Sequence, residues 1–167
     1  MSGRLSGGAV NTQHSFNKPN ANKLAVIGGL LGLLPFWGLA LAELWESGEQ
    51  VVSASTYLVN YAALILTFVG AIWWGIALTA SQDSLGGIAR SFLFGWSLVP
   101  CLLAWFLLLL DPAIALIAIA SLLLLQWLLD FIFLWRTQLI AQWFWQLRVV
   151  LTLGAVPALL LAALRLS

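Results

Sequence analysis

The sequence AIALIAIASLLLLQWLLDFIFL at residues 113–134 contains a single ionisable side chain, Asp130, among 22 residues. A helix of about 20 predominantly apolar residues is long enough to cross the hydrocarbon core of a bilayer. Most of this segment's surface would be unfavourably exposed on a small domain in water. The segment therefore predicts a membrane-spanning helix.

The rest of the chain has the same character. Hydrophobic residues make up 62% of the 167 residues, charged residues make up 8%, and the mean hydropathy is +1.01. Soluble domains average about 45–50% apolar and about 25% charged residues. We therefore expect an all-α integral membrane protein, a single bundle of five transmembrane helices. The expected spans are residues 24–42, 55–80, 92–110, 113–134 and 147–166.

Two further segments flank these spans. Residues 1–23 are rich in Gly, Ser and Asn and predict a disordered cytoplasmic tail. Residues 135–146 have a helical period of Trp and Leu opposite a stripe of Gln, which predicts a short amphipathic helix in the membrane interface. Ala40-Leu41-Ala42 resembles a signal-peptidase site, but the long run before it favours a retained helix, with cleavage as the alternative.

Lys and Arg indicate the orientation, because cytoplasmic connections retain them. In the expected topology one side of the membrane holds Arg4, Lys18, Lys23, Arg90, Arg136 and Arg148, and the other side holds Arg165. The amino terminus should therefore be cytoplasmic and the carboxyl terminus outside. Glu43, Glu46 and Glu49 then belong to an outer loop, which we interpret as solvated because a cation site would need further oxygen ligands.

Small residues recur at four-residue spacing in two expected spans: Gly28 and Gly32 in the first, and Thr67, Ala71, Gly75 and Thr79 in the second. Small side chains let helix backbones approach closely in a bilayer. We expect these faces, together with Trp74, to pack against helices of this chain or of another subunit.

Pro35, Pro100 and Pro157 lie near the middle of the first, third and fifth spans. Each proline frees the carbonyl four residues earlier from its helical partner. The three freed carbonyls could line a shared cavity. The interpretation we favour is that neighbouring groups satisfy the backbone, as is common in membrane helices.

Asp130 is the one acidic residue well inside an apolar run, and Gln126 lies one turn earlier on the same face. Ionisable groups at such depth are costly and are usually paired. Arg148 and Arg90 lie near the same interface, and we expect Asp130 to form an ion pair with Arg148. A proton or substrate site at Asp130 is the alternative.

The composition excludes several kinds of chemistry. His14 lies in the expected tail and Cys101 in an apolar run, so one chain cannot assemble a haem, copper, iron-sulfur or zinc site in the membrane, and we expect no metal or cofactor. Asp111 and Asp130 are ~28 Å apart along the chain, too far for an aspartyl protease dyad. A membrane serine protease needs a histidine base within the bundle, and the expected spans contain no histidine. We therefore predict that the protein is not an enzyme, and its net charge of +1 gives no surface for nucleic acid.

Five segments together are similar to the domain-of-unknown-function family that includes transmembrane protein 69, small membrane proteins of bacteria and mitochondria. They are GLLPF at 32–36, YAALILTFVGAIWWG at 61–75, VPCLLAW at 99–105, the LLLLQWLLD run ending at Asp130, and WFWQLRVVLT at 143–152. The chain departs from the family pattern at Trp73, where relatives carry a polar residue. The resemblance implies a small multi-span protein and no established activity.

Two function classes follow from these observations. The first is a non-catalytic protein that packs against another membrane protein, or against itself, during assembly of a larger complex. The alternative is a permease for a small solute or protons, based on the aligned prolines, Gln126 and Asp130. We expect the bacterial cytoplasmic (inner) membrane as the location, with the mitochondrial inner membrane as the alternative.

Overall fold

The structure is a computed structural model that describes residues 18–45, 53–80 and 86–166. The described residues form helices and no strands. The helical elements are α1 (Lys18–Leu31), α2 (Leu33–Trp45), α3 (Ala54–Thr79), α4 (Gly87–Leu107), α5 (Pro112–Leu129), the π-helical turn η1 (Asp130–Trp135) and α6 (Gln142–Leu166).

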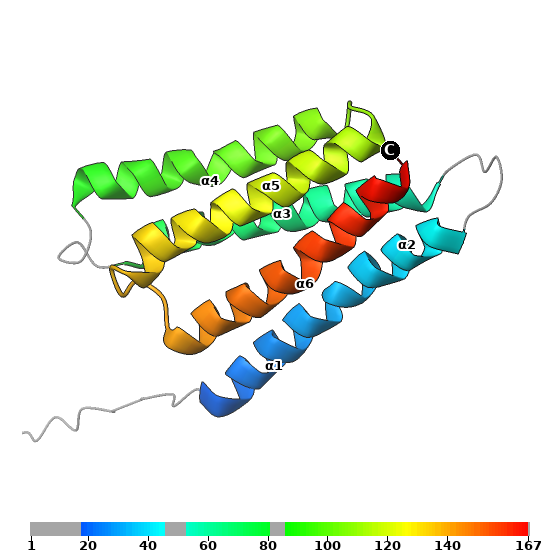
Figure 1. The fold of residues 1–167 in the computed structure, drawn as a ribbon. Coiled ribbons are helices and arrows are strands. Elements are labelled where there is room, and N and C mark those ends of the chain that lie inside the picture. The colour runs from blue at the N-terminus through cyan, green and yellow to red at the C-terminus, as the bar shows by residue number, and fades with distance from the viewer. Residues whose placement is uncertain (1–17, 46–52, 81–85, 167) are drawn as a thin grey trace, which may run out of the picture.

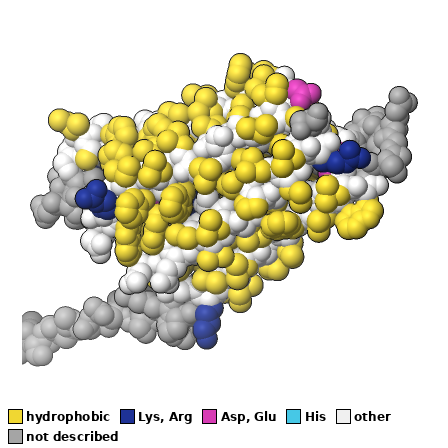
Figure 2. Space-filling view, viewed as in Figure 1, with side chains coloured by type: hydrophobic (Ala, Val, Ile, Leu, Met, Phe, Trp, Pro, Cys, Tyr) yellow, Lys and Arg dark blue, Asp and Glu magenta, His cyan; other side chains and the backbone are white. Residues whose placement is uncertain are grey.

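Five helical stretches of the described chain are long and apolar enough to cross a membrane, with α1 and α2 forming one stretch and α5 and η1 another. Successive spans run in opposite directions, so the first and last described residues lie at opposite ends of the bundle (Figure 1). Hydrophobic side chains cover the middle of the visible face, and the visible charged side chains lie near its ends (Figure 2). This arrangement agrees with a multi-pass membrane protein.

The centre of the bundle is formed by α3, α5 and α6. α3 packs against α2, α4 and α5, whereas α6 packs against α5 and α2. α4 lies at one edge and α1 at the other (Figure 1). The larger apolar core joins α2, α3, α4, α5 and α6, and a smaller cluster at one end of the bundle contains Trp73, Ala77, Leu93 and Leu134.

The connection between α4 and α5 is a tight hairpin. Pro112 occupies the first turn of α5, where a missing N–H costs nothing. The Asp111 carboxylate caps the helix by accepting a hydrogen bond from the backbone N–H of Ala113 at 2.9 Å.

Three predicted boundaries need correction. α1 begins at Lys18, so residues 18–23 are helical rather than part of a disordered tail, and the remainder of that tail, residues 1–17, lies outside the described residues. α4 and α6 also begin five residues before the predicted spans. The cause is that helices continue past the hydrocarbon boundary into the interface, where polar side chains are tolerated.

The separate amphipathic helix predicted for residues 135–146 is absent from the structure. The π-helical turn ends at Trp135, Gln138 adopts a left-handed φ of 58°, and α6 begins at Gln142. The aromatic residues of this segment pack on one another, because the Trp145 ring stacks against Trp127 and Trp135 at 5.5 and 5.9 Å. Of these three tryptophans only Trp135 belongs to the predicted helical stripe, so the stacking reflects packing of η1, α5 and α6 rather than an amphipathic helix.

The small-residue stripe of α3 points mostly away from the other helices of this chain. Ala71, Gly75 and Thr79 are exposed, Thr67 is half-buried, Trp74 is 43% exposed, and a Cβ added at Gly75 meets nothing within 4 Å. Gly75 meets no other helix of the described chain, whereas the Trp74 ring packs edge-to-face on Phe94 of α4 with centroids 5.0 Å apart. Packing of the exposed stripe against another subunit stays a prediction. The Thr67 and Thr79 hydroxyls donate to the carbonyls of Ala63 and Gly75, so an outward position leaves no polar group unsatisfied.

The close approach of α3 instead occurs at Gly70. A Cβ at that position would lie 2.7 Å from Cγ of Pro100 in α4. The predicted Gly28 and Gly32 pair is similarly displaced, because Gly28 faces open space and the neighbouring Gly29 meets the side chains of Leu151 and Leu147. Gly29 rather than Gly28 thus makes the close contact with α6, whereas Gly32 meets Tyr61 of α3.

The three prolines do not converge on one cavity. Pro100 is buried against Gly70, Pro35 is half-buried and Pro157 is exposed. The helix is interrupted at Gly32, near Pro35, and the Gly32 carbonyl accepts a hydrogen bond from the Tyr61 hydroxyl at 2.8 Å. The carbonyl that Pro35 frees is that of Leu31, so this bond does not repair it. The separate positions of the three prolines support their interpretation as ordinary features of membrane helices.

Candidate functional site

Asp130 lies where α5 passes into the π-helical turn, and only 3% of its surface is exposed. Its Oδ2 accepts hydrogen bonds from Nε of Arg148 at 2.9 Å and from Nη2 at 2.5 Å. Arg148, in the second turn of α6, is 4% exposed. The two residues form a buried ion pair, the pairing that their common depth predicts.

The other carboxylate oxygen is also fully engaged. Oδ1 of Asp130 accepts from Nε1 of Trp73 at 2.6 Å and from Nε2 of Gln126 at 3.1 Å. Oε1 of Gln126 in turn accepts from Nε1 of Trp96 at 3.0 Å. The polar network therefore joins α3, α4, α5 and α6. In each of its contacts an N–H donor meets an oxygen acceptor.

An aromatic enclosure holds the Trp73 indole against the carboxylate. Phe92, Trp96 and Phe133 lie around it with ring centroids 5.9 to 6.1 Å from that of Trp73. The Trp73 side chain is fully buried. Apolar rings therefore exclude water on that side of Asp130, while the indole N–H supplies a hydrogen bond in its place.

The structure brings together Asp130, Arg148 and Gln126, but not the fourth predicted residue, Arg90. Nη2 of Arg90 donates to the Ala80 carbonyl at 2.7 Å and so closes the carboxyl end of α3. Arg90 is a capping residue in this structure.

Trp73 and Trp96 are the network members that the sequence analysis did not assign. Buried tryptophan N–H groups usually have an acceptor, but their burial becomes visible only once the helices are placed. Asp130 and Gln126 were the nearest acceptors at the matching depth. At Trp73, where the family resemblance implies a polar residue, the chain still supplies a polar group, through an indole.

A second buried carboxylate lies at the other end of the bundle. Glu43 is 7% exposed, and its Oε2 accepts a hydrogen bond from the backbone N–H of Ser55 at 2.7 Å. The prediction of a solvated loop is therefore wrong for Glu43, because the first turn of α3 has N–H groups that lack helical partners. Glu46 and Glu49 lie outside the described residues, and the described part of the chain holds no cluster of metal-ligating side chains.

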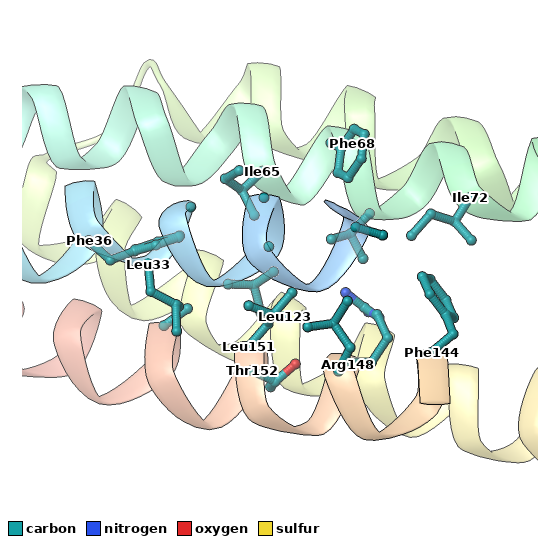
Figure 3. A pocket seen from close by; sticks show the side chains of 17 residues that line it. Leu33, Phe36, Ile65, Phe68, Ile72, Leu123, Phe144, Arg148, Leu151 and Thr152 are labelled. Atoms are coloured by element: carbon teal, nitrogen blue, oxygen red, sulfur yellow. The ribbon is translucent and has the colours of Figure 1, made fainter. Parts of the chain in front are cut away.

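A cavity of about 400 Å³ adjoins the ion pair. It lies between α1, α2, α3, α5 and α6, and Figure 3 shows Arg148 and Thr152 of α6 among its lining side chains. The rest of its lining is almost entirely apolar and includes Leu33, Phe36, Ile65, Phe68, Leu123 and Leu151.

Comparison with family models places nearly the whole chain in one protein family. Residues 21–164 match the family described as protein of unknown function DUF3429. The chain belongs to this family. The assignment confirms that the resemblance is to a domain-of-unknown-function family, while the relation to transmembrane protein 69 stays a prediction. No curated protein and no solved structure matches the chain.

The DUF3429 match covers all or most of every helix described above and includes Asp130 and Arg148. Chemically, the network is closed, because each carboxylate oxygen of Asp130 already accepts two N–H donors. Such an arrangement holds four helices in register. The groups left for a further molecule are those that line the cavity.

Proposed function

We propose that this DUF3429 protein is a non-catalytic, multi-pass membrane protein that assembles with another membrane protein. The observation that carries the proposal is the closed network around Asp130, in which Trp73, Gln126 and Arg148 occupy both carboxylate oxygens. A catalytic or transported proton would need an acceptor that is free to change partners.

The permease alternative has less support. Its motivation was a polar cavity lined by carbonyls beside the three prolines, whereas the cavity of about 400 Å³ has mainly apolar lining and none of its lining residues is a proline. Asp130 is also separated from that cavity by its partner Arg148, because Arg148 lines the cavity and Asp130 does not. A hydrated path to the carboxylate is the feature that transport would require.

The outward stripe of α3 is the surface that we assign to the partner. Ala71, Gly75 and Thr79 lie at four-residue spacing on an exposed face, and Gly75 has open space around it. A helix of a partner protein could approach this backbone closely. Such contact would give the outward-facing small residues a packing role that this chain alone does not provide.

The test is purification of the full chain in mild detergent with identification of bound membrane proteins. Gly75→Leu should abolish the association, while Gly38→Leu, also in open space but on α2, should retain it. Equal association by both variants, or a parent that carries neither a partner nor a second copy of itself, would overturn the proposal. Flux of protons or of a small solute through the protein in proteoliposomes would support the permease alternative instead.

We also propose insertion in the bacterial inner membrane with a cytoplasmic amino terminus and an outer carboxyl terminus. The uneven distribution of Lys and Arg supports this orientation. Alkaline phosphatase fused after Ser167 should be active, and an inserted but inactive fusion would reverse the assignment. The mitochondrial inner membrane is the alternative location.

A further inference from the structure

The cavity has the size and lining of a site for a small apolar molecule. Ligand sites in proteins measure about 300–1,000 Å³ and combine mostly apolar walls with a few polar groups that fix orientation. Here the volume is about 400 Å³, the side chains of Phe36, Phe68 and Phe144 contribute rings to the lining, and Arg148 and Thr152 supply the polar side chains. Phe68 is 68% exposed, so the cavity reaches the outer surface of the bundle beside α3.

The two polar side chains lie on one face of α6, four residues apart, and both are at least nine-tenths buried. Nε and Nη2 of Arg148 donate to Asp130, and Nη1 has no partner among the described residues. The Thr152 hydroxyl likewise has no hydrogen-bond partner among them. The other described threonines all form a side-chain hydrogen bond. Hydrogen-bond donors are therefore available at this end of an apolar cavity.

Charge restricts what these donors can receive. Asp130 already neutralises Arg148, so an anionic ligand would add an uncompensated charge within the hydrocarbon region. An uncharged acceptor such as a carbonyl oxygen carries no such cost and satisfies the free N–H and O–H groups.

Depth restricts the ligand further. Residues 142–146 of α6 extend into the interface, so Arg148 lies at the edge of the hydrocarbon region and Thr152 lies ~8 Å beyond residue 147, the first of the predicted span. A phospholipid is held by its charged headgroup at the interface, above Thr152. A lipid with a small uncharged head can reach it.

We propose that the cavity binds a neutral, single-tailed lipid whose head is a carbonyl-bearing ring, the chemistry of a membrane quinone. The ring lies among the phenylalanine side chains, and a ring carbonyl accepts hydrogen bonds from Arg148 and Thr152. The tail leaves the cavity beside Phe68 into the bilayer. The inference concerns binding only and does not depend on the partner proposed above.

The experiment measures binding of decylubiquinone to the purified full chain in lipid nanodiscs, by saturable quenching of tryptophan fluorescence and by native mass spectrometry. Thr152→Val removes the hydroxyl at constant shape and should weaken binding about three- to tenfold, the size of one hydrogen bond. Thr67→Val, which removes a hydroxyl outside the cavity lining, is the matched control and should bind like the parent.

A second pair of variants tests the space itself. Gly28 lines the cavity and Gly38 does not, yet a Cβ at either position meets nothing within 4 Å. Gly28→Leu should reduce binding at least tenfold, and Gly38→Leu should leave it unchanged. Absence of saturable binding by the parent, equal binding by parent and Thr152→Val, or stronger binding of phosphatidylglycerol than of the quinone would overturn the proposal.

Discussion

Two buried carboxylates, Asp130 and Glu43, lie at opposite ends of the bundle and are stabilised in different ways. Asp130 accepts four N–H groups from three side chains, one of them the cationic Arg148. Glu43 accepts the backbone N–H of Ser55 in the first turn of α3. The positive end of a helix dipole stabilises a carboxylate modestly, whereas a buried ion pair depends strongly on both partners. The two ends should therefore respond very differently to loss of an acid.

The largest effect is expected at the Asp130 end. Asp130→Asn and Arg148→Gln should each lower the free energy of unfolding by about 3–5 kcal/mol, because each leaves a buried charge without its partner. The double variant should lose less than the sum of the two. Unfolding of all four proteins in mild detergent provides the cycle, and strictly additive losses would contradict the coupling.

This pairing illustrates what the sequence could predict. Asp130 and Arg148 were assigned to each other from depth alone, because a carboxylate inside an apolar run needs a partner at the same level. The five spans followed from apolar length. Each of these features depends on position along the membrane normal, which sequence records directly.

Rotation about the helix axis was harder to predict. In water the polar face of a helix identifies its buried face, but in lipid both faces of α3 are apolar and that contrast is lost. The stripe through Gly75 therefore looked like a packing face, although contact with α4 is made at Gly70. The same limitation concealed Trp73 and Trp96, whose N–H groups identify a network only once the helices are placed.

The second prediction tests whether the neutral donors matter at the Asp130 end. Trp73→Phe keeps an aromatic ring in the enclosure but removes the N–H that bonds to Oδ1 at 2.6 Å. Loss of a hydrogen bond to a charged group should cost about 1.5–3 kcal/mol. Chemical unfolding in detergent measures it. A loss as large as that of Arg148→Gln would mean that ring packing, rather than the hydrogen bond, dominates.

The third prediction concerns the middle of the bundle, which connects the two ends. Gly70→Ala places a methyl group 2.7 Å from the Pro100 ring and should destabilise the protein by about 1–3 kcal/mol. Gly75→Ala, on the same helix and in open space, is the matched control and should be neutral or slightly stabilising in the isolated chain. Thermal midpoints in detergent compare the two, and equal losses would return Gly75 to the packing face.

The smallest effect is expected at Glu43. Glu43→Gln retains an oxygen that can accept from the Ser55 N–H and removes only the charge, which the amino-terminal dipole of α3 stabilises by about 0.3–1 kcal/mol. Glu43→Leu also removes the acceptor and leaves a buried N–H unsatisfied, so its loss should be larger, about 1–3 kcal/mol. Unfolding in detergent separates these cases. If Glu43→Gln matched the loss of Asp130→Asn, Glu43 would have to serve as the counter-ion of a buried cation, and the contrast between the two ends would fail. We therefore expect Glu43→Gln to be the most stable of the three variants, Glu43→Leu to be less stable and Asp130→Asn to be the least stable. The reason is that a backbone N–H can donate to a neutral amide oxygen instead of a carboxylate, whereas the charge of Arg148 needs a carboxylate.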